Sequence, residues 1–330
     1  MKVNICAYRF QQIQEDWIEY YKILIKSLQK LGLDVCVSPH LHYVRDLPGV
    51  SVGIEDNSED IYIFNHCTIP ELVKNGFELG SRTLILKGSG PSAKYFSLDT
   101  LGYAAYSSIT YNKPPLSFVN VGSFWNEVEQ MVAEKVNKWD TASHVPDFYS
   151  PGIDIPSDHT LIVGQMNGHE TVTNFSFGDH ITKLDKIVTS LNTSYPVVVK
   201  LHPYTFVNGQ ESFFKKVRGL VEKWKKKGAY VLSDFESIHD ILPKTRVAIV
   251  ENSTAGLECM MHEVPVISYG FPEYHWNTKE LRHAIHVNSL VNDLSWFSKQ
   301  NNRKFMTWYL RDYLCYDVES TTKRLKSLIF

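Results

Sequence analysis

The amino-acid sequence predicts an α/β protein built from two doubly wound lobes. Short apolar runs of strand length alternate with amphipathic helical segments in both halves of the 330-residue chain. A segment rich in Pro, Ser and Asp, residues 141–158, separates the two halves. The length also suits two domains of roughly 150 residues each.

The first half has a β-α-β order, which indicates a parallel sheet flanked by helices. Apolar residues recur at helical spacing over residues 16–31, and Gly32 follows as a stop signal. The predicted strands are residues 3–7, 35–38, 61–64 and 84–87, and a further helix is predicted over residues 124–139.

The same alternation restarts after the linker and predicts a second doubly wound unit. In such sheets ligands bind outside the carboxyl ends of the strands, so we expect the active site in the cleft between the lobes. The predicted strands are residues 160–163, 197–201, 229–232, 247–250 and 265–269, and the predicted helices are 179–191, 211–227, 255–262 and, in pattern, 302–330.

Composition excludes several classes of protein. Hydrophobic residues make up 43% and charged residues 21%, which argues against disorder. The net charge of −2 gives no general attraction to nucleic acid. No apolar run approaches the ~18 residues needed to span a bilayer, and the N-terminus carries no signal-peptide pattern. The five cysteines are scattered without a C-x-x-C pair. We therefore expect a cytoplasmic protein.

The strongest local signal is the segment VAIVENSTAGLECMMHEVPVISYG. A strand there runs through a short polar loop into a helix, whose free N–H groups and dipole would attract an anion. Glu258 lies one turn on, where a carboxylate can accept hydrogen bonds from two ribose hydroxyls. A simple helix cap without a ligand is the alternative. The candidate binding residues are Asn252, Ser253, Thr254, Gly256 and Glu258.

Two further strand ends in the second half carry polar residues. VVVKLHP places Lys200, His202 and Pro203 at the end of an apolar strand, where an imidazole can donate to a phosphate or a leaving oxygen. The alternative is a solvated loop histidine. The segment LIVGQMNGHETVTNFSFGDH is a natural place for a nucleophile or an acid/base group. Its candidates are Gln165, Asn167, His169, Glu170 and Thr171.

In the first half, LILKGSGPS makes a tight loop after a strand. It lacks the G-x-x-x-x-G-K-[ST] pattern of a Walker A loop, so we interpret it as an acceptor-side or sugar-side loop, with a structural turn as the alternative. The candidate residues are Lys87, Ser89, Gly90 and Ser92.

The helix predicted over residues 211–227 is rich in lysine. A solvated charged face is the preferred interpretation, and contact with an anionic membrane surface is the alternative. The chain has no D-x-D signature, so we expect no required metal and no required cofactor.

These segments, in this order, resemble the retaining β-Kdo transferases of bacterial capsule and O-antigen (lipopolysaccharide) synthesis. Those enzymes use CMP-Kdo, in which Kdo is an eight-carbon acidic sugar. The resemblance covers most of the chain. LHP and ENSTAGLE resemble the family's His-Pro and Ser-Ser/Thr motifs, which bind CMP, and GQMNGHETV and LDTLGY are similar to two further shared stretches.

The resemblance implies a GT-B-like architecture of two Rossmann-like lobes. Residues 1–150 would form an acceptor-side lobe, 151–300 a CMP-sugar lobe, and 301–330 a helical segment that can pack back on the first lobe. In the implied site, Ser253 and Thr254 hold the phosphate, His202 assists departure of CMP, and Glu258 holds the ribose. The implied partners are CMP-Kdo and a glycan or glycolipid acceptor, with peripheral contact to the inner membrane or to other polysaccharide-synthesis enzymes left open.

One position departs from the family pattern. The loop that resembles the Gly-Gln segment has His169 where the family carries a nucleophilic aspartate. Double displacement needs a nucleophile that forms a covalent glycosyl-enzyme, which a carboxylate does well. His169 can be that nucleophile, Glu170 can replace it, or the chain can be an inactive or substituted form that only binds CMP-sugar. Another CMP- or CDP-dependent transferase, acting on sialyl or polyol-phosphate units, is a further alternative.

Overall fold

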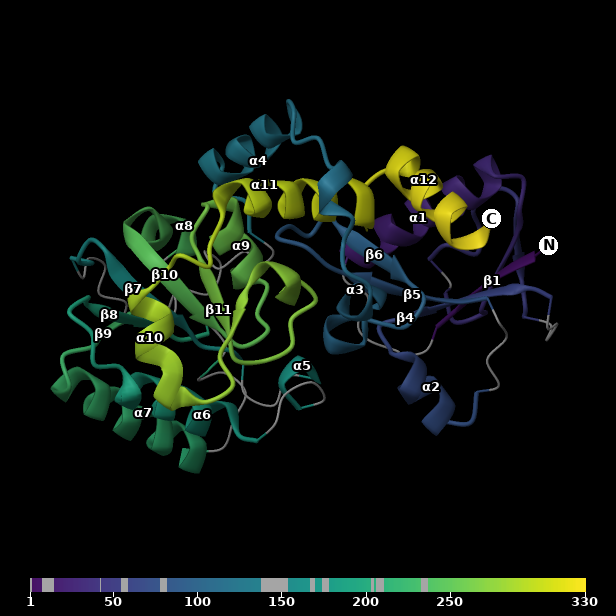
Figure 1. Ribbon diagram of the computed structural model, residues 1–330. Coiled ribbons are helices and arrows are strands. Elements are labelled where there is room, and N and C mark those ends of the chain that lie inside the picture. Colours follow the sequence, from purple (N-terminus) through teal and green to yellow (C-terminus); the bar gives the residue numbers. More distant parts are fainter. Residues whose placement is uncertain are drawn as a thin grey trace. The chain divides into compact units, whose positions relative to one another are not determined.

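The computed structural model describes residues 2–7, 15–41, 43–54, 59–77, 82–137, 154–166, 170–173, 178–202, 205, 211–232 and 237–330. The chain divides into two compact units (Figure 1). Unit 1 contains Met1–Pro114 and Thr307–Phe330, and unit 2 contains Pro115–Met306. Each has a largely parallel sheet, so the predicted fold class, two Rossmann-like α/β lobes, is confirmed.

Unit 1 has a seven-stranded sheet in the order β13-β6-β5-β4-β1-β2-β3. Strands β1 to β5 run parallel, β6 is antiparallel to β5, and β13 is antiparallel to β6. Strands β2 and β3 lie on one side of β1, and β4, β5 and β6 lie on the other, so the strand order reverses between β1 and β4. The strands are β1 (Lys2–Cys6), β2 (Asp34–Val37), β3 (Val50–Val52), β4 (Ile61–Asn65), β5 (Thr83–Gly88), β6 (Phe96–Asp99) and β13 (Leu314–Cys315).

The helices of unit 1 bury apolar residues against this sheet. Helix α1 presents Leu24 and Leu28, both fully buried, to β-strand residues such as Val3. The last helix, α12, packs on α1: Ser27 Oγ donates to the Val318 carbonyl at 3.2 Å. The C-terminal segment from Thr307 therefore belongs to the core of unit 1. The helices are α1 (Glu15–Lys30), α2 (Ile69–Lys74), α3 (Ser108–Tyr111) and α12 (Val318–Ile329).

Unit 2 has a six-stranded, fully parallel sheet in the order β12-β11-β10-β7-β8-β9. The chain winds outward from β7 through β8 to β9, then returns to the other side of β7 with β10. The switch point of this doubly wound sheet therefore lies between β7 and β10. The strands are β7 (His159–Val163), β8 (Val197–Lys200), β9 (Tyr230–Leu232), β10 (Thr245–Val250), β11 (Val266–Ser268) and β12 (Lys279–Glu280).

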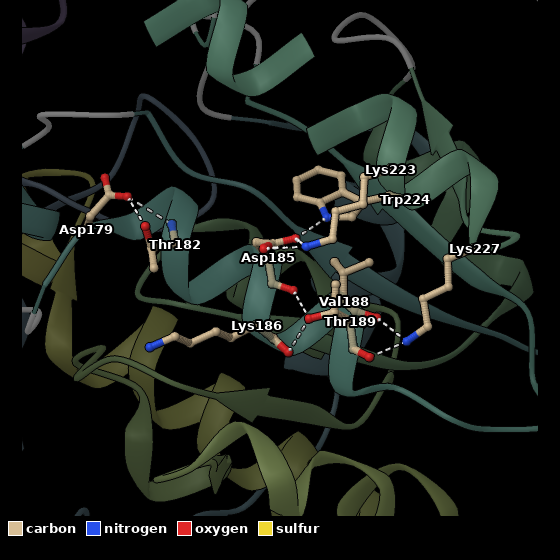
Figure 2. A network of polar contacts seen from close by, with 9 residues as sticks. All are labelled: Asp179, Thr182, Asp185, Lys186, Val188, Thr189, Lys223, Trp224 and Lys227. Carbon is tan, nitrogen blue, oxygen red and sulfur yellow. Dashed lines mark hydrogen bonds and ion pairs between the residues drawn. The ribbon is translucent and has the colours of Figure 1, made fainter. Parts of the chain in front are cut away.

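Two lysines of the lysine-rich segment connect helices α7 and α6 of unit 2. Asp185 on α6 accepts hydrogen bonds from Lys223 Nζ at 2.8 Å and from the indole of Trp224 at 2.9 Å (Figure 2). Lys227, just beyond α7, donates to the Val188 carbonyl near the end of α6 at 3.3 Å and to the carbonyl of Leu191, which follows α6, at 3.0 Å. These lysines thus join α7 to α6 and cap its C-terminus. The helices are α4 (Phe124–Ala133), α5 (Glu170–Thr173), α6 (His180–Ser190), α7 (Glu211–Lys226), α8 (Ile238–Ile241), α9 (Ala255–Met261), α10 (Val287–Asn292) and α11 (Lys299–Trp308).

The division of the chain differs from the boundaries expected at residues 150 and 300. Helix α4, expected in the first lobe, groups with unit 2, where Arg303 of α11 lies over the ring of Trp125 at 4.9 Å. The expected linker, residues 141–158, lies largely outside the described residues.

Candidate nucleotide site in unit 2

The carboxyl ends of β7 and β10 bring two polar segments together at the switch point of unit 2. Gln165 follows β7, and Glu251 and Asn252 follow β10. The backbone N–H of Asn252 donates to Gln165 Oε1 at 3.4 Å, so the two strand ends are in direct contact. The structure therefore brings together Gln165 and Asn252, which were predicted from separate motifs.

A buried carboxylate, Glu251, lies beneath this pair. Its two oxygens accept hydrogen bonds from His180 Nδ1 and from Lys183 Nζ, and the side chains of Glu251 and His180 have no exposed surface. The backbone N–H of Gln165 donates to His180 Nε2 at 2.9 Å. Because Nε2 accepts, the ring proton lies on Nδ1 and points to Glu251. The Glu251 carboxylate thus fixes the end of β7 through hydrogen bonds to and from the neutral imidazole of His180.

Helix α5 completes the network. Gln165 Nε2 donates to Thr171 Oγ1 at 2.8 Å, and Asn252 Nδ2 donates to the Thr171 carbonyl at 2.5 Å. The remaining amide oxygen of Asn252, Oδ1, is buried and has no hydrogen-bond partner in the described part of the chain. A buried acceptor of this kind costs free energy unless a donor reaches it, so it marks a place for a ligand donor or a water.

The start of α9 corrects one expectation. The N–H of Ala255 donates to Ser253 Oγ at 3.3 Å, and the N–H of Gly256 donates to the Ser253 carbonyl at 3.0 Å. These two N–H groups are therefore already used within the turn, and the helix has only seven residues. The half-buried Ser253 and Thr254 side chains remain the groups that can meet a phosphate here.

Gly256 serves a packing role. A Cβ atom on it would lie 2.3 Å from the Tyr274 hydroxyl and 2.5 Å from Cζ. That hydroxyl donates to the carbonyl of Ser253, so the tyrosine ring packs against the start of α9. The close approach expected for Gly256 is therefore made by a side chain of the protein itself.

Lys200 and Glu258 form a second polar pair in unit 2. Lys200 ends β8, Glu258 lies in α9, and each is 7% exposed. Burial raises the pKa of the Glu258 carboxyl to about 7, and the positive charge of Lys200 acts in the opposite direction. Glu258 therefore changes its charge near neutral pH, which makes it a functional candidate.

The histidines predicted as catalytic are described only in part. His202 follows β8 and is half-buried, and its carbonyl accepts from the N–H of Thr205 at 2.9 Å. Pro203, Asn167 and His169 lie outside the described residues, as does the side chain of Glu170, whose backbone begins α5. The predicted nucleophile stays a prediction, as does the expected cleft between the lobes.

The residues predicted to form an acceptor-side or sugar-side loop in unit 1 make two different kinds of contact. Ser89 Oγ lies 3.1 Å from Ser97 Oγ, and the N–H of Tyr95 donates to the Ser92 carbonyl at 3.2 Å. Gly90 has φ +84°, and a Cβ there would lie 2.8 Å from Leu314 Cδ1. Ser89, Gly90 and Ser92 thus shape the turn. Lys87 instead contacts His66 at 2.6 Å.

Sequence reasoning missed His180, Lys183 and Glu251. Glu251 directly follows an apolar strand, and an acidic residue there was a usable signal. His180 and Lys183 have no such signal, because their partner is 71 and 68 residues away in the sequence.

Within the described ranges, no group of three or more His, Cys, Asp or Glu residues could hold a metal. Among those same residues, no helix has the length and apolar character needed to cross a membrane.

Fold and site together define a two-unit α/β protein with a polar site at the switch point of its second sheet, the arrangement typical of nucleotide-binding folds. Residues 131–281, which contain that site, match the family model described as capsule polysaccharide biosynthesis protein. A comparison with curated proteins finds no match.

Two solved structures share the fold. The first is the β-Kdo 2,7 transferase of Thermosulfurimonas dismutans KpsC, which matches with a TM-score of 0.55 and 14% sequence identity over 99% of each chain. The second is the β-Kdo 2,4 transferase of the same KpsC, which matches with a TM-score of 0.53 and 15% sequence identity over 100% of this chain and 98% of that chain. The predicted resemblance to β-Kdo transferases is therefore confirmed through the fold and the capsule family match, at low sequence identity.

Proposed function

We propose that this protein is a glycosyltransferase of capsule polysaccharide synthesis that binds a CMP-activated sugar on unit 2. The observation that carries the proposal is the polar site at the β7–β10 switch point, with Glu258 one turn beyond Ser253 and Thr254. The family match to capsule synthesis covers this part of the chain, and the shared fold with β-Kdo transferases supports the same class.

Each polar group has a role in the proposed complex. The hydroxyls of Ser253 and Thr254 bind the phosphate, and the ionised carboxyl of Glu258 accepts hydrogen bonds from the ribose hydroxyls. The Lys200 ammonium supplies the positive charge that offsets ionised Glu258, and it can donate a charge-assisted hydrogen bond to an anionic nucleotide. His202 donates to the phosphate as CMP leaves, which stabilises the charge that develops there.

The proposed reaction transfers Kdo, or a related acidic sugar, with retention. The nucleophile attacks the anomeric carbon as the bond to the CMP phosphate breaks, and CMP leaves with the bonding electrons. The acceptor hydroxyl oxygen then attacks the anomeric carbon as the bond from that carbon to the enzyme breaks, and the hydroxyl proton passes to solvent water. We propose His169 as the nucleophile and Glu170 as the residue that would replace it. No metal takes part in the proposed reaction.

A second candidate function is CMP-sugar binding without turnover. It is favoured by one sequence observation, the imidazole of His169 at the position where a carboxylate is expected. An imidazole adduct is cationic and does not stabilise an oxocarbenium-like transition state as a carboxylate does.

Calorimetric titration tests the nucleotide site shared by both candidates. CMP should bind saturably to the wild-type protein and more weakly to Ser253→Ala and to Glu258→Gln. Ser289→Ala is a matched control, because Ser289 lies on α10 and its hydroxyl donates to the His286 carbonyl at 2.8 Å. Absence of CMP binding by the wild-type protein would refute the proposal.

A further inference from the structure

Helix α6 begins with a buried histidine, His180, that has no role in the reaction proposed above. The residue is 1% exposed, and its Nε2 accepts the backbone N–H of Gln165 at 2.9 Å. Gln165 lies just beyond the end of β7, and the proposed nucleophile His169 follows it in the sequence. His180 therefore holds the chain where the segment that contains the proposed nucleophile leaves the sheet.

The chain just before Gln165 is held against the end of β8. The backbone N–H of Gly164 donates to the Lys200 carbonyl at 2.8 Å. A Cβ atom on Gly164 would lie 3.2 Å from Leu201 Cα and 3.4 Å from the backbone nitrogen of His202, so this position leaves little room for a side chain. The start of the segment is thus fixed close to the backbone of His202, the residue proposed to assist the departure of CMP.

The far end of the segment is tied back to its start. The Thr171 hydroxyl accepts from Gln165 Nε2 at 2.8 Å, and the Thr171 carbonyl accepts from Asn252 Nδ2 at 2.5 Å. Gln165 Oε1 also accepts the backbone N–H of Asn252 at 3.4 Å. Gln165 and Thr171 are therefore joined to each other and to the end of β10. Holding both ends of a short segment reduces the conformations that are open to it.

The groups that anchor His180 have little freedom to move. Glu251, which accepts from His180 Nδ1, is 0% exposed. A Cβ atom on Gly270 would lie 2.9 Å from Glu251 Cγ, so the Glu251 side chain packs directly on the backbone beyond β11. The first turn of α6 is capped by Asp179, which accepts the Thr182 N–H at 3.0 Å (Figure 2). The imidazole is therefore fixed both by its helix and by its carboxylate partner.

We propose that His180 is a positioning residue for sugar transfer, which acts through the backbone of Gln165 on the segment between Gln165 and Thr171. Reacting groups must be held close to their productive geometry, and a misplacement of about 1 Å can lower a rate roughly a hundredfold. A neutral imidazole suits this role because it donates to a carboxylate on one side and accepts an N–H on the other. The inference rests on the proposed function, and it links His180 to the rate of the reaction and not to nucleotide affinity.

The test is the first half-reaction, in which CMP is released from CMP-Kdo by the full chain without acceptor, measured by rapid mixing. His180→Phe keeps a ring and removes both ring hydrogen bonds. It should lower the rate constant at saturating donor roughly tenfold to a hundredfold, with less than about a twofold change in the half-saturating donor concentration and in the calorimetric affinity for CMP. His180→Gln should recover most of the rate, because its amide oxygen can accept the Gln165 N–H in place of Nε2.

His239→Phe is the matched control, because His239 is a second buried histidine in unit 2 with two ring contacts. It lies in α8 and is 3% exposed, its Nδ1 is 2.9 Å from His262 Nε2, and its Nε2 donates to the Val136 carbonyl at 2.8 Å. This variant should lose stability but release CMP at the wild-type rate. A purely structural role for His180 would instead give His180→Phe and His239→Phe the same rate constant.

Thr171→Val loosens the other end of the segment without touching His180, and it decides the question if His180→Phe does not fold. Loss of the hydroxyl that accepts from Gln165 should lower the same rate constant roughly fivefold, as expected for one hydrogen bond. Hydrogen exchange of peptides that contain Gln165 should be faster in both variants than in the wild-type protein.

Wild-type rates in both His180→Phe and Thr171→Val, or a loss of CMP affinity as large as the loss of rate, would overturn the inference and leave the proposed function in place. A wild-type protein that binds CMP but releases none from CMP-Kdo would overturn the proposed transfer, and this inference with it.

Discussion

The carboxylate of Glu251 accepts a hydrogen bond from Nδ1 of His180, and neither side chain is exposed to solvent. The same imidazole accepts the backbone N–H of Gln165 at 2.9 Å. One buried chain of hydrogen bonds, from Glu251 through the neutral imidazole of His180 to the backbone of Gln165, therefore connects the ends of β10 and β7, the two strands that border the switch point of unit 2.

Replacing Glu251 should destabilise the protein strongly. Glu251→Ala would leave His180 and the ammonium of Lys183 without their buried acceptor, and losing one partner of a buried pair costs about 3–5 kcal/mol. Since the side chain of Lys183 is 22% exposed, solvation of its ammonium would offset part of this destabilisation, and we expect a loss at the lower end of the range. Urea unfolding measures the change.

Glu222→Ala is the control for that measurement. Glu222 pairs with Lys225 at 3.5 Å on the surface of α7, and the two side chains are 66% and 51% exposed. Exposed pairs contribute about 0–1 kcal/mol. Equal losses for the two variants would show that the Glu251 pair has no special role in stability.

Glu258 should make nucleotide affinity depend on pH near neutrality. Its pKa is raised to about 7, so it is protonated below that pH and ionised above it. The ionised form accepts hydrogen bonds from the ribose, so CMP affinity should rise as the pH increases through 7. Calorimetry between pH 6 and 8 on the wild-type protein and Glu258→Gln isolates this effect, because the titration of CMP itself cancels. Parallel pH profiles for the two proteins would rule out the ribose role.

The Glu258 carboxyl should also make the free energy of unfolding depend on pH, but in the direction opposite to that of the CMP affinity. The folded protein holds the Glu258 proton more tightly than the unfolded chain does, because the pKa of this carboxyl is about 7 in the folded protein and 4.5 when it is unperturbed. This contribution to the free energy of unfolding is therefore greatest at low pH and declines as the pH rises from about 4.5 to 7. Glu258→Gln should be less sensitive to pH than the wild-type protein over that interval in urea unfolding.

Replacing two different glycines with alanine should change the stability of the protein in opposite directions. Gly256→Ala places a Cβ 2.3 Å from the Tyr274 hydroxyl and should destabilise by about 1–3 kcal/mol, the usual cost of overpacking. Gly219→Ala, in the middle of α7 with open space around it, should stabilise by about 0.5–1 kcal/mol because alanine favours the helix. Thermal unfolding compares them, and a stable Gly256→Ala protein would contradict the packing described at α9.

Metal removal tests another part of the proposal. Because no step of the proposed reaction uses a metal, sugar transfer from the CMP-activated donor should continue at the same rate after dialysis against EDTA. Loss of transfer that added Mg²⁺ or Mn²⁺ restores would show that the proposed chemistry is incomplete.

The sequence predicted the fold class because the long core strands and helices have clear periodicity. The β1 residues Val3 and Ile5 and the α1 residues Leu24 and Leu28 are all buried in one core, as their spacing predicts. Short edge elements such as β3, β12 and β13, with two or three residues each, carry no periodic signal and were missed. The boundary was also set differently, because α4 joins unit 2 through contacts distant in the sequence.

The candidate site was predictable where a polar residue ends an apolar strand. Gln165, Lys200 and Asn252 were identified in this way. Glu251 was overlooked between two stronger signals, and His180 could not be found because only the folded chain brings it to Glu251. Gly256 is an example of a misleading signal. Its position at the start of a helix suggested close contact with a ligand, but the group that packs against it is the side chain of Tyr274.

The central claim is that this chain transfers a sugar from a CMP-activated donor through a covalent intermediate. The most direct measurement is the intact mass of the protein after incubation with CMP-Kdo generated in place, with and without an acceptor glycan. The account predicts the added mass of one Kdo residue, mapped to His169 and lost in His169→Ala, and discharged when acceptor is present. Saturable CMP binding with neither adduct nor product would contradict the claim and leave a protein that binds the donor without transferring it.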